Sequence, residues 1–177
     1  MFTSPRIEPC SEDAHSEEIL DIFNEAIANS NALYEYHPRT PEFMRGWFAE
    51  KHSKNFPVLG AFDECGVLMG FASYGRFRPQ PAFKYTVEHS IYIHHAHRGK
   101  GIGRVLLDAL IEHAHAQEYH CMVGCIDAAN SASIMLHEQM GFTYAGTIQQ
   151  AGFKFGEWLD LAFYQLLLNT PDVPVDG

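Results

Sequence analysis

Residues 98–104 concentrate positive charge and glycine in one short segment. Their sequence, Arg-Gly-Lys-Gly-Ile-Gly-Arg, holds three of the 12 lysines and arginines in a chain whose formal net charge is -10. Glycines let the backbone approach a ligand closely, and the N–H groups at the start of a helix attract anions. Because a helical pattern begins at Gly101, the segment predicts a local anion site that could hold a pyrophosphate. A strained turn with three solvated cations is the other interpretation of these residues.

The spacing of these glycines differs from that of two common nucleotide-binding motifs. The phosphate-binding loop GxxxxGK[ST] is absent, and the dinucleotide fingerprint GxGxxG would need a glycine where Leu106 stands. The pattern that is present is R-x-x-G-x-G, with Arg98, Gly101 and Gly103 at its fixed positions. Neither of the two nucleotide-binding folds is therefore predicted.

A strand predicted over residues 86–94 leads into this segment and carries polar side chains at alternate positions, among them Glu88. A partly buried carboxylate can act as a general base, because burial raises the pKa of such a group toward neutral pH. A strand glutamate that faces solvent is the more common case. Arg76 and Arg78 precede this strand, and a guanidinium can hold a carboxylate through two parallel hydrogen bonds. These residues are candidates for a proton acceptor and for a carboxylate anchor.

The order of the predicted elements indicates the α/β (α+β) class, with a mixed central sheet and helices on both faces. At 177 residues the chain fits a single domain, residues 1–177, which ends in a short polar C-terminal tail over residues 169–177. Helices are predicted over residues 17–30, 40–51, 101–118 and 131–140, and strands over residues 57–63, 67–76, 86–94, 121–127, 142–153 and 158–168.

Composition and charge exclude several classes of protein. Because 46% of the residues are hydrophobic and 19% are charged, the chain is expected to fold rather than to remain disordered. The 22 acidic residues against 12 basic ones disfavour a broad electrostatic surface for nucleic acid or anionic membranes. No run reaches the roughly 18 apolar residues of a membrane span, and residues 1–13 lack the apolar stretch of a secretory signal. The expected location is the cytoplasm.

The cysteines and histidines show no pattern of a disulfide framework or a metal site. The four cysteines form no CxxC pair, which indicates reduced thiols, and Cys121 and Cys125 are interpreted as structural. His94, His95 and His97 crowd three potential ligands into four residues, without a carboxylate or cysteine partner at a suitable spacing. We therefore predict no disulfide and no bound metal.

Two motifs together resemble the Gcn5-related N-acetyltransferases (GNAT superfamily). The R-x-x-G-x-G pattern is similar to the pyrophosphate loop of that family. The helix predicted over residues 131–140, preceded by Asn130 and followed by Gly141-Phe142, is similar to its cofactor-supporting helix. Four further segments narrow the resemblance to the subfamily of phosphinothricin and methionine sulfoximine acetyltransferases, namely residues 32–36, 38–41, 85–90 and 154–160.

The resemblance implies a GNAT-like, mostly antiparallel sheet and an acetyl-CoA-dependent N-acetyltransferase. Its implied acceptor is the α-amino group of a small amino acid analogue of the phosphinothricin, methionine sulfoximine or methionine sulfone type, and a homodimer is expected by analogy. The residues implied for acetyl-CoA are Ile91, Tyr92, Ile93, Arg98, Gly99, Lys100, Gly101, Ile102, Gly103, Arg104, Asn130 and Ser133. Those expected around the acceptor are Arg76, Arg78, Tyr34, Tyr36, Tyr85 and Ser90, with Arg78 as the preferred anchor.

Two residues are candidates for proton transfer. Glu88 is the expected general base, because an attacking amine must be neutral. His137 stands where family members commonly carry a tyrosine that protonates the leaving thiolate. It could therefore act as the acid, act as a second base, or only orient cofactor and substrate.

Two other functions stay open at this point. One is an N-acetyltransferase for a different amine, such as a polyamine or a protein N-terminus, although two arginines near the acceptor argue against a polycation. The other is a catalytically silent acyl-CoA sensor, which the presence of Glu88 beside the glycine segment disfavours.

Overall fold

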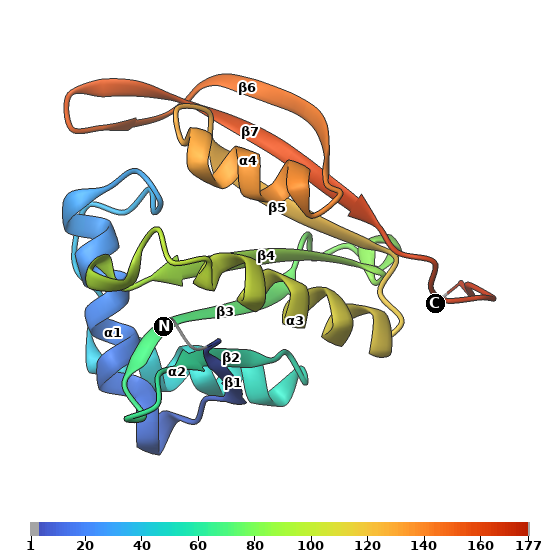
Figure 1. Ribbon diagram of the computed structural model, residues 1–177. Coiled ribbons are helices and arrows are strands. Elements are labelled where there is room, and N and C mark those ends of the chain that lie inside the picture. Colours follow the sequence, from blue (N-terminus) through green and yellow to red (C-terminus); the bar gives the residue numbers. More distant parts are fainter. Residues whose placement is uncertain (1–3, 177) are drawn as a thin grey trace. The chain divides into compact units, whose positions relative to one another are not determined.

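Seven hydrogen-bonded strands follow one another in the order β1-β2-β3-β4-β5-β7-β6 in the computed structural model, which describes residues 4–176 (Figure 1). The pairs β1–β2, β2–β3, β5–β7 and β6–β7 are antiparallel, and β4–β5 is parallel. The helices are α1 (Glu12–Asn29), α2 (Pro41–Ser53), α3 (Ile102–Ala116) and α4 (Ser131–Gln139), and short 3-10 helices are η1 (Pro81–Phe83) and η2 (His95–His97). The strands are β1 (Arg6–Pro9), β2 (Val58–Phe62), β3 (Leu68–Arg76), β4 (Thr86–Ile93), β5 (Cys121–Asp127), β6 (Thr143–Lys154) and β7 (Glu157–Leu167).

The predicted α/β class and the mostly antiparallel sheet are confirmed, with two differences. Helix α1 begins at Glu12 rather than at residue 17, because Ser11 has the extended conformation of an N-cap and acidic residues occupy the first turn. Strand β1 was not predicted. Its four residues form an edge strand that ends in Pro9 and pairs only with β2, so it lacks the apolar run that signals a central strand.

The chain divides into two compact units, and the boundaries between them fall within β3, β4 and α3. The first unit comprises the chain up to Ser73 together with Ile91–Leu110, and the second comprises Tyr74–Ser90 and the chain from Ile111 onward. Strands β3 and β4 and helix α3 therefore contribute residues to both units. That the whole chain forms one domain stays a prediction.

The first unit is built on an apolar core beneath α1 and α2. An aromatic cluster forms its centre, with Phe23 of α1 in edge-to-face contact with Trp47 of α2 at 5.6 Å and with Phe71 of β3 at 4.9 Å. Helix α2 starts as predicted, with Pro41 in its first turn and the Thr40 hydroxyl accepting a hydrogen bond from the Phe43 N–H. The other buried members of the core are Ile19, Ile22, Met44, Phe48, Val58, Phe62 and Leu68.

The second unit places helix α4 beside strands β5 and β7, as Figure 1 shows. Strand β5 pairs in parallel with the start of β4, from Thr86↔Cys121 to His89↔Gly124. The long β6–β7 hairpin closes through Phe155 and Gly156, whose φ values of 51° and 81° are those of a two-residue hairpin turn. This unit therefore fixes the start of β4 against β5 and α4.

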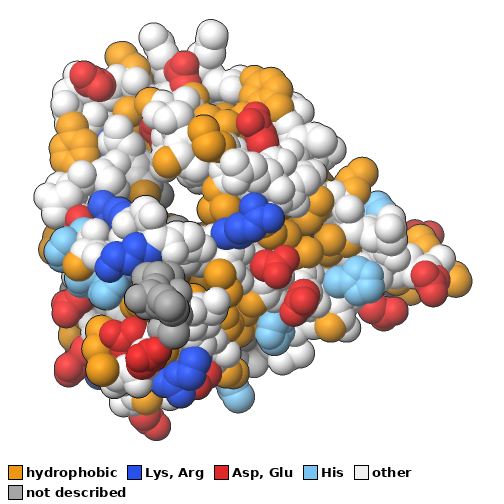
Figure 2. Space-filling view, viewed as in Figure 1, with side chains coloured by type: hydrophobic (Ala, Val, Ile, Leu, Met, Phe, Trp, Pro, Cys, Tyr) orange, Lys and Arg blue, Asp and Glu red, His pale blue; other side chains and the backbone are white. Residues whose placement is uncertain are grey.

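The surface agrees with a chain of negative net charge. On the face drawn in Figure 2, basic side chains stand singly or in small groups among acidic and apolar ones. None of the helices formed by residues 4–176 is long and apolar enough to cross a membrane.

Candidate functional site

The end of β4 is held closely by its neighbours within the first unit. The ring of Tyr92 packs against those of Phe23 and Phe71, at 5.1 and 5.5 Å between centroids. A Cβ atom on Gly70 of β3 would lie 2.8 Å from the Tyr92 carbonyl oxygen and 3.1 Å from Cα of Ile93. Only glycine permits this approach. The backbone of residues 91–93, which sequence reasoning assigned to the acetyl carrier, thus has a defined position.

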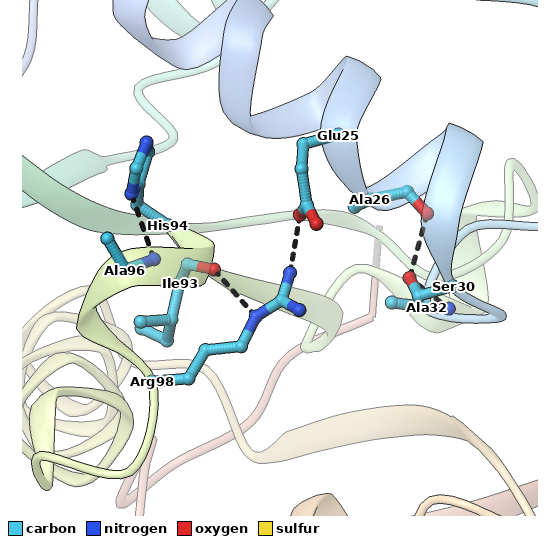
Figure 3. Close-up of polar contacts among 8 residues, drawn as sticks. All are labelled: Glu25, Ala26, Ser30, Ala32, Ile93, His94, Ala96 and Arg98. Carbon is cyan, nitrogen blue, oxygen red and sulfur yellow. Dashed lines mark hydrogen bonds and ion pairs between the residues drawn. The ribbon is translucent and has the colours of Figure 1, made fainter.

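The three histidines that follow β4 form a capped turn. The His94 ring accepts a hydrogen bond from the Ala96 N–H at 3.2 Å through Nδ1 (Figure 3) and stacks on the His95 ring at 4.3 Å. The His97 N–H donates to the His94 carbonyl. Within residues 4–176, no group of three histidine, cysteine or carboxylate side chains is arranged to hold a metal ion. The absence of a bound metal stays a prediction.

The glycine segment leaves its backbone open. Gly99 and Gly101 have φ values of 76° and 78°, in the left-handed region that favours glycine. A Cβ atom on either would meet no described atom within 4 Å, so the conformation, and not crowding, requires glycine there. Helix α3 follows at once, and its first residue, Ile102, is 1% exposed and anchors the segment to the core. The segment thus presents backbone N–H groups at the start of a helix.

The three cations of this segment differ in their contacts. Arg98 pairs with Glu25 of α1 and donates a hydrogen bond to the Ile93 carbonyl (Figure 3). Lys100 donates to the Ala96 carbonyl at 3.1 Å. The Arg104 side chain is exposed and forms no ion pair or hydrogen bond with the described residues, whereas its backbone N–H donates to the Gly101 carbonyl at 3.1 Å. Two of the three cations that were predicted to hold an anion are therefore engaged within the protein.

Glu88 lies in the second unit, half-buried on β4 in register with Val123 of β5. The thiol of Cys125, two residues further along β5, lies close enough to the Glu88 carboxylate for the two groups to interact electrostatically. Burial and this carboxylate raise the pKa of Cys125 to about 12, with Arg78 opposing the shift as a nearby positive charge. Cys125 therefore stays protonated at neutral pH. Sequence reasoning missed this proximity, because it interpreted Cys125 as structural.

His137 is buried in the second unit, and both of its ring nitrogens have partners. Nδ1 lies 2.7 Å from the Ser133 carbonyl oxygen, and Nε2 lies 3.0 Å from Nε2 of His89. The two imidazoles stack at 5.0 Å, and each contacts Phe142. Gly124 of β5 makes room for them, since a Cβ atom there would lie 3.1 Å from both rings. No sequence pattern pointed to His89.

These contacts determine the protonation of the histidine pair. His137 must carry its proton on Nδ1 to donate to the Ser133 carbonyl, so its Nε2 accepts from the Nε2–H of His89. The Nδ1 atom of His89 is then a buried acceptor, and it has no hydrogen-bond partner among the described residues. Burial, reinforced by the neighbouring His137, lowers the pKa of His89 to about 3. Burial also lowers the pKa of His137, against the effect of its bond to Ser133. The pair is neutral at pH 7.

Asn130 and Tyr85 are engaged within the second unit. The Asn130 side-chain oxygen accepts from the Ser133 N–H at 3.1 Å and caps α4. The Tyr85 hydroxyl accepts from the Val175 N–H at 3.2 Å, so it contacts the C-terminal tail.

The other predicted acceptor residues are distributed over both units. Arg76 and Arg78 are exposed, and Ser90 is half-buried, in the second unit. Tyr34 and Tyr36 belong to the first unit. Within the second unit, the charges of Glu88 and Arg78 both act on the Cys125 thiol, in opposite directions.

A glycine segment that opens helix α3 a short turn after β4, together with a carboxylate on that strand, agrees with the family that the sequence resembles. The chain belongs to the acetyltransferase (GNAT) family, which matches residues 17–142. The predicted superfamily membership and N-acetyltransferase activity are confirmed.

Three relatives are particularly similar. L-methionine sulfoximine/L-methionine sulfone acetyltransferase of Pseudomonas aeruginosa is 46% identical over 151 residues, which are 85% of this chain and 88% of that protein. A solved structure from Acinetobacter baylyi has a TM-score of 0.96 at 59% identity and covers 97% of both chains. Phosphinothricin acetyltransferase from Sinorhizobium meliloti, solved in complex with AcCoA, has a TM-score of 0.93 at 33% identity and covers 97% of this chain and 93% of that one.

The histidine pair gives the first testable prediction. Nitrogen-15 NMR is expected to show the proton on Nδ1 of His137 and on Nε2 of His89, with the His89 ring neutral from pH 8 to pH 5 and the pKa of His137 below its usual value. Because folding lowers both pKa values, the unfolded chain binds these protons first as pH falls below 6.5. Stability therefore decreases toward acid, by up to about 1.4 kcal/mol per pH unit for His89, and the lowered pKa of His137 acts in the same direction. The exposed histidines serve as internal reference, and a normal titration of either ring near pH 6.5 would contradict the assignment.

Proposed function

We propose that this N-acetyltransferase transfers the acetyl group of acetyl-CoA to the α-amino group of a small amino acid analogue of the methionine sulfoximine, methionine sulfone or phosphinothricin type. The observation that carries the proposal is the composition of β4. One strand holds the half-buried Glu88, whose carboxylate interacts with the Cys125 thiol, and also residues 91–93, which precede the glycine segment. The relative of known name at 46% identity and the AcCoA complex at 33% identity support the substrate class and the acetyl donor.

Glu88 is the proposed general base. The amine nitrogen forms a C–N bond with the acetyl carbon, and Glu88 accepts the proton that the nitrogen loses, directly or through water. The C–S bond breaks, and the departing thiolate takes up a proton. The Cys125 thiol stays protonated beside the Glu88 carboxylate and so adds no charge next to the proposed base. The backbone N–H groups of residues 91–93 are proposed to polarise the thioester carbonyl.

His137 is proposed to orient α4 rather than to transfer protons. Its Nδ1–H is committed to the Ser133 carbonyl, and its Nε2 accepts from His89. Delivering a proton to a thiolate would require this buried pair to break and would leave two polar groups without partners. Of the three roles that the sequence left open, the contacts support the orienting one.

Arg78 is proposed to anchor the carboxylate of the acceptor. It is exposed, its guanidinium lies over the Phe77 ring at 4.4 Å, Nη1 donates to the Phe77 carbonyl, and its charge acts on Cys125. The other N–H groups of the guanidinium stay able to donate two parallel hydrogen bonds to a carboxylate. This position would bring the α-amino group of a bound amino acid close to Glu88.

We also propose that the enzyme is a cytoplasmic homodimer. The β6–β7 hairpin exposes Phe153, Phe155 and Trp158, with relative exposures of 46%, 61% and 62%. Exposed aromatic side chains that cluster on one hairpin are typical of a protein interface. A second copy of the chain is the proposed partner. The four free cysteines suit a reducing compartment.

The function is tested by incubating the protein with acetyl-CoA and a panel of amines while free thiol release is followed. Methionine sulfoximine, methionine sulfone and phosphinothricin are expected to react, and a polyamine and a peptide N-terminus are not. Glu88→Gln is expected to lower kcat by roughly a hundredfold to ten-thousandfold near pH 7. The loss shrinks as pH rises, because more of the amine is then neutral. Glu64→Gln, on an exposed turn, is the matched control. Full turnover of Glu88→Gln at every pH would refute the base assignment.

Arg78→Ala is expected to raise the KM of the acceptor by roughly tenfold to a hundredfold with little effect on the KM of acetyl-CoA, since it removes charged hydrogen bonds to the carboxylate. Arg45→Ala, which removes an exposed arginine from α2, is the control. An acceptor methyl ester tests the cause, because it lacks the carboxylate charge and should not distinguish Arg78→Ala from the unmodified enzyme. An unchanged acceptor KM would exclude Arg78 as the anchor.

Light scattering tests the dimer, which should have twice the chain mass of 20.0 kDa. Trp158→Glu is expected to yield monomers, because it places a charge in the aromatic cluster. Val173→Glu, on the exposed C-terminal tail, should leave the mass of the assembly unchanged. A monomer before any substitution would rule out the homodimer.

A further inference from the structure

Arg98 is the first residue of the R-x-x-G-x-G pattern, yet its guanidinium is directed to the protein. One amino nitrogen, Nη2, lies 2.5 Å from Oε2 of Glu25, and Nε donates to the Ile93 carbonyl at 3.2 Å (Figure 3). All three residues belong to the first unit. Arg98 therefore connects helix α1, the last residue of β4 and the start of the glycine segment.

The partner on α1 is well fixed. The Glu25 side chain is 21% exposed, against 48% for Arg98. Its helical neighbours Phe23 and Ala26 are buried, and the Ser30 hydroxyl donates to the Ala26 carbonyl at the end of the helix. A carboxylate held at this place neutralises the Arg98 charge. It would also repel a diphosphate that approached the same guanidinium, so Arg98 is a poor direct ligand while the pair persists.

The other end of the contact lies where position matters for catalysis. Ile93 is the last residue of β4. It packs closely against Gly70 of β3, since a Cβ atom added to Gly70 would lie 3.1 Å from Cα of Ile93. The Arg98 Nε–H, five residues later in the chain, donates a hydrogen bond to the Ile93 carbonyl and so restrains the strand end as well. Removing Arg98 would free the strand end whose N–H groups are proposed to polarise the thioester.

We propose that Glu25 and Arg98 are positioning residues, which hold the end of β4 and the start of the glycine segment in the geometry that binds acetyl-CoA. The positive side chain for the diphosphate is then Arg104, which has no ionic partner among the described residues, together with the backbone N–H groups of the segment. This inference rests on the proposed function, because it takes acetyl-CoA as the ligand.

Calorimetry with acetyl-CoA separates this role from direct contact, because the two predict opposite signs for Glu25→Gln. If Arg98 positions the strand end through Glu25, then Glu25→Gln and Arg98→Gln each weaken binding by about tenfold. The double variant is then no weaker than the poorer single variant, since both substitutions break one unit. If Arg98 binds the diphosphate in competition with Glu25, Glu25→Gln tightens binding instead.

Two further measurements distinguish positioning from a general loss of structure: the salt dependence of acetyl-CoA binding, and activity with a truncated acetyl donor. Arg104→Gln is expected to reduce the slope of log Kd against log salt concentration, whereas Arg98→Gln retains the slope of the unmodified protein. With acetyl-pantetheine, which lacks the diphosphate, Arg98→Gln should still lower kcat/KM. Should Arg98→Gln fail to fold, Arg98→Lys keeps a positive charge that can pair with Glu25. Adding Glu25→Gln to Arg98→Lys then shows whether loss of the carboxylate weakens or tightens acetyl-CoA binding.

Two results would overturn the inference: tighter acetyl-CoA binding by Glu25→Gln, or full activity of Arg98→Gln with acetyl-pantetheine. Either would make Arg98 a direct diphosphate ligand. A failure of the unmodified protein to bind acetyl-CoA would instead overturn the proposed function itself, so the two failures are distinguishable.

Discussion

The organisation of this enzyme depends on how closely strand β4 is approached by the elements around it, and two glycines make that approach possible. Gly70 of β3 leaves room for the backbone of Tyr92 and Ile93, and Gly124 of β5 leaves room for the rings of His89 and His137. A side chain at either position would meet atoms closer than ordinary van der Waals contact. Because β4 carries the proposed base near its middle and the proposed carbonyl-polarising N–H groups at its end, this close packing defines the geometry of the chemistry.

Several charged or titratable side chains of this protein are paired or kept neutral by groups of the protein itself. The chain carries a net charge of -10, yet an anionic co-substrate is proposed to bind it, so attraction must come from a few local groups. Within the glycine segment, Glu25 balances the charge of Arg98. Lys100 donates a hydrogen bond to a backbone carbonyl. In the second unit the buried histidines stay neutral. Most polar side chains near β4 therefore bond to other parts of the protein. The backbone N–H groups of the glycine segment and the Arg104 side chain are the groups proposed to bind acetyl-CoA.

The contacts of Glu88 connect packing to acetyl transfer. A general base must keep its carboxylate accessible, and Glu88 is half-buried beside a thiol that stays protonated and so adds no charge. Arg78 is exposed in the same unit, and its charge acts on the same thiol. An amino acid acceptor brings its own carboxylate, and a cation beside the base can hold that group while the α-amino group faces the thioester.

Local patterns in the sequence were sufficient for most elements and for the family, and tertiary structure decided the partners. The Thr40-Pro41 helix start, the strand over residues 121–127 and the R-x-x-G-x-G segment depend on neighbours within a few residues, so spacing alone predicted them. The Glu25–Arg98 and His89–His137 contacts join residues 73 and 48 positions apart. No local period encodes such pairs, because they form only when separate helices and strands pack. For that reason the sequence identified His137 and Arg98 as functional candidates, whereas only the folded chain shows that both are committed to partners within the protein.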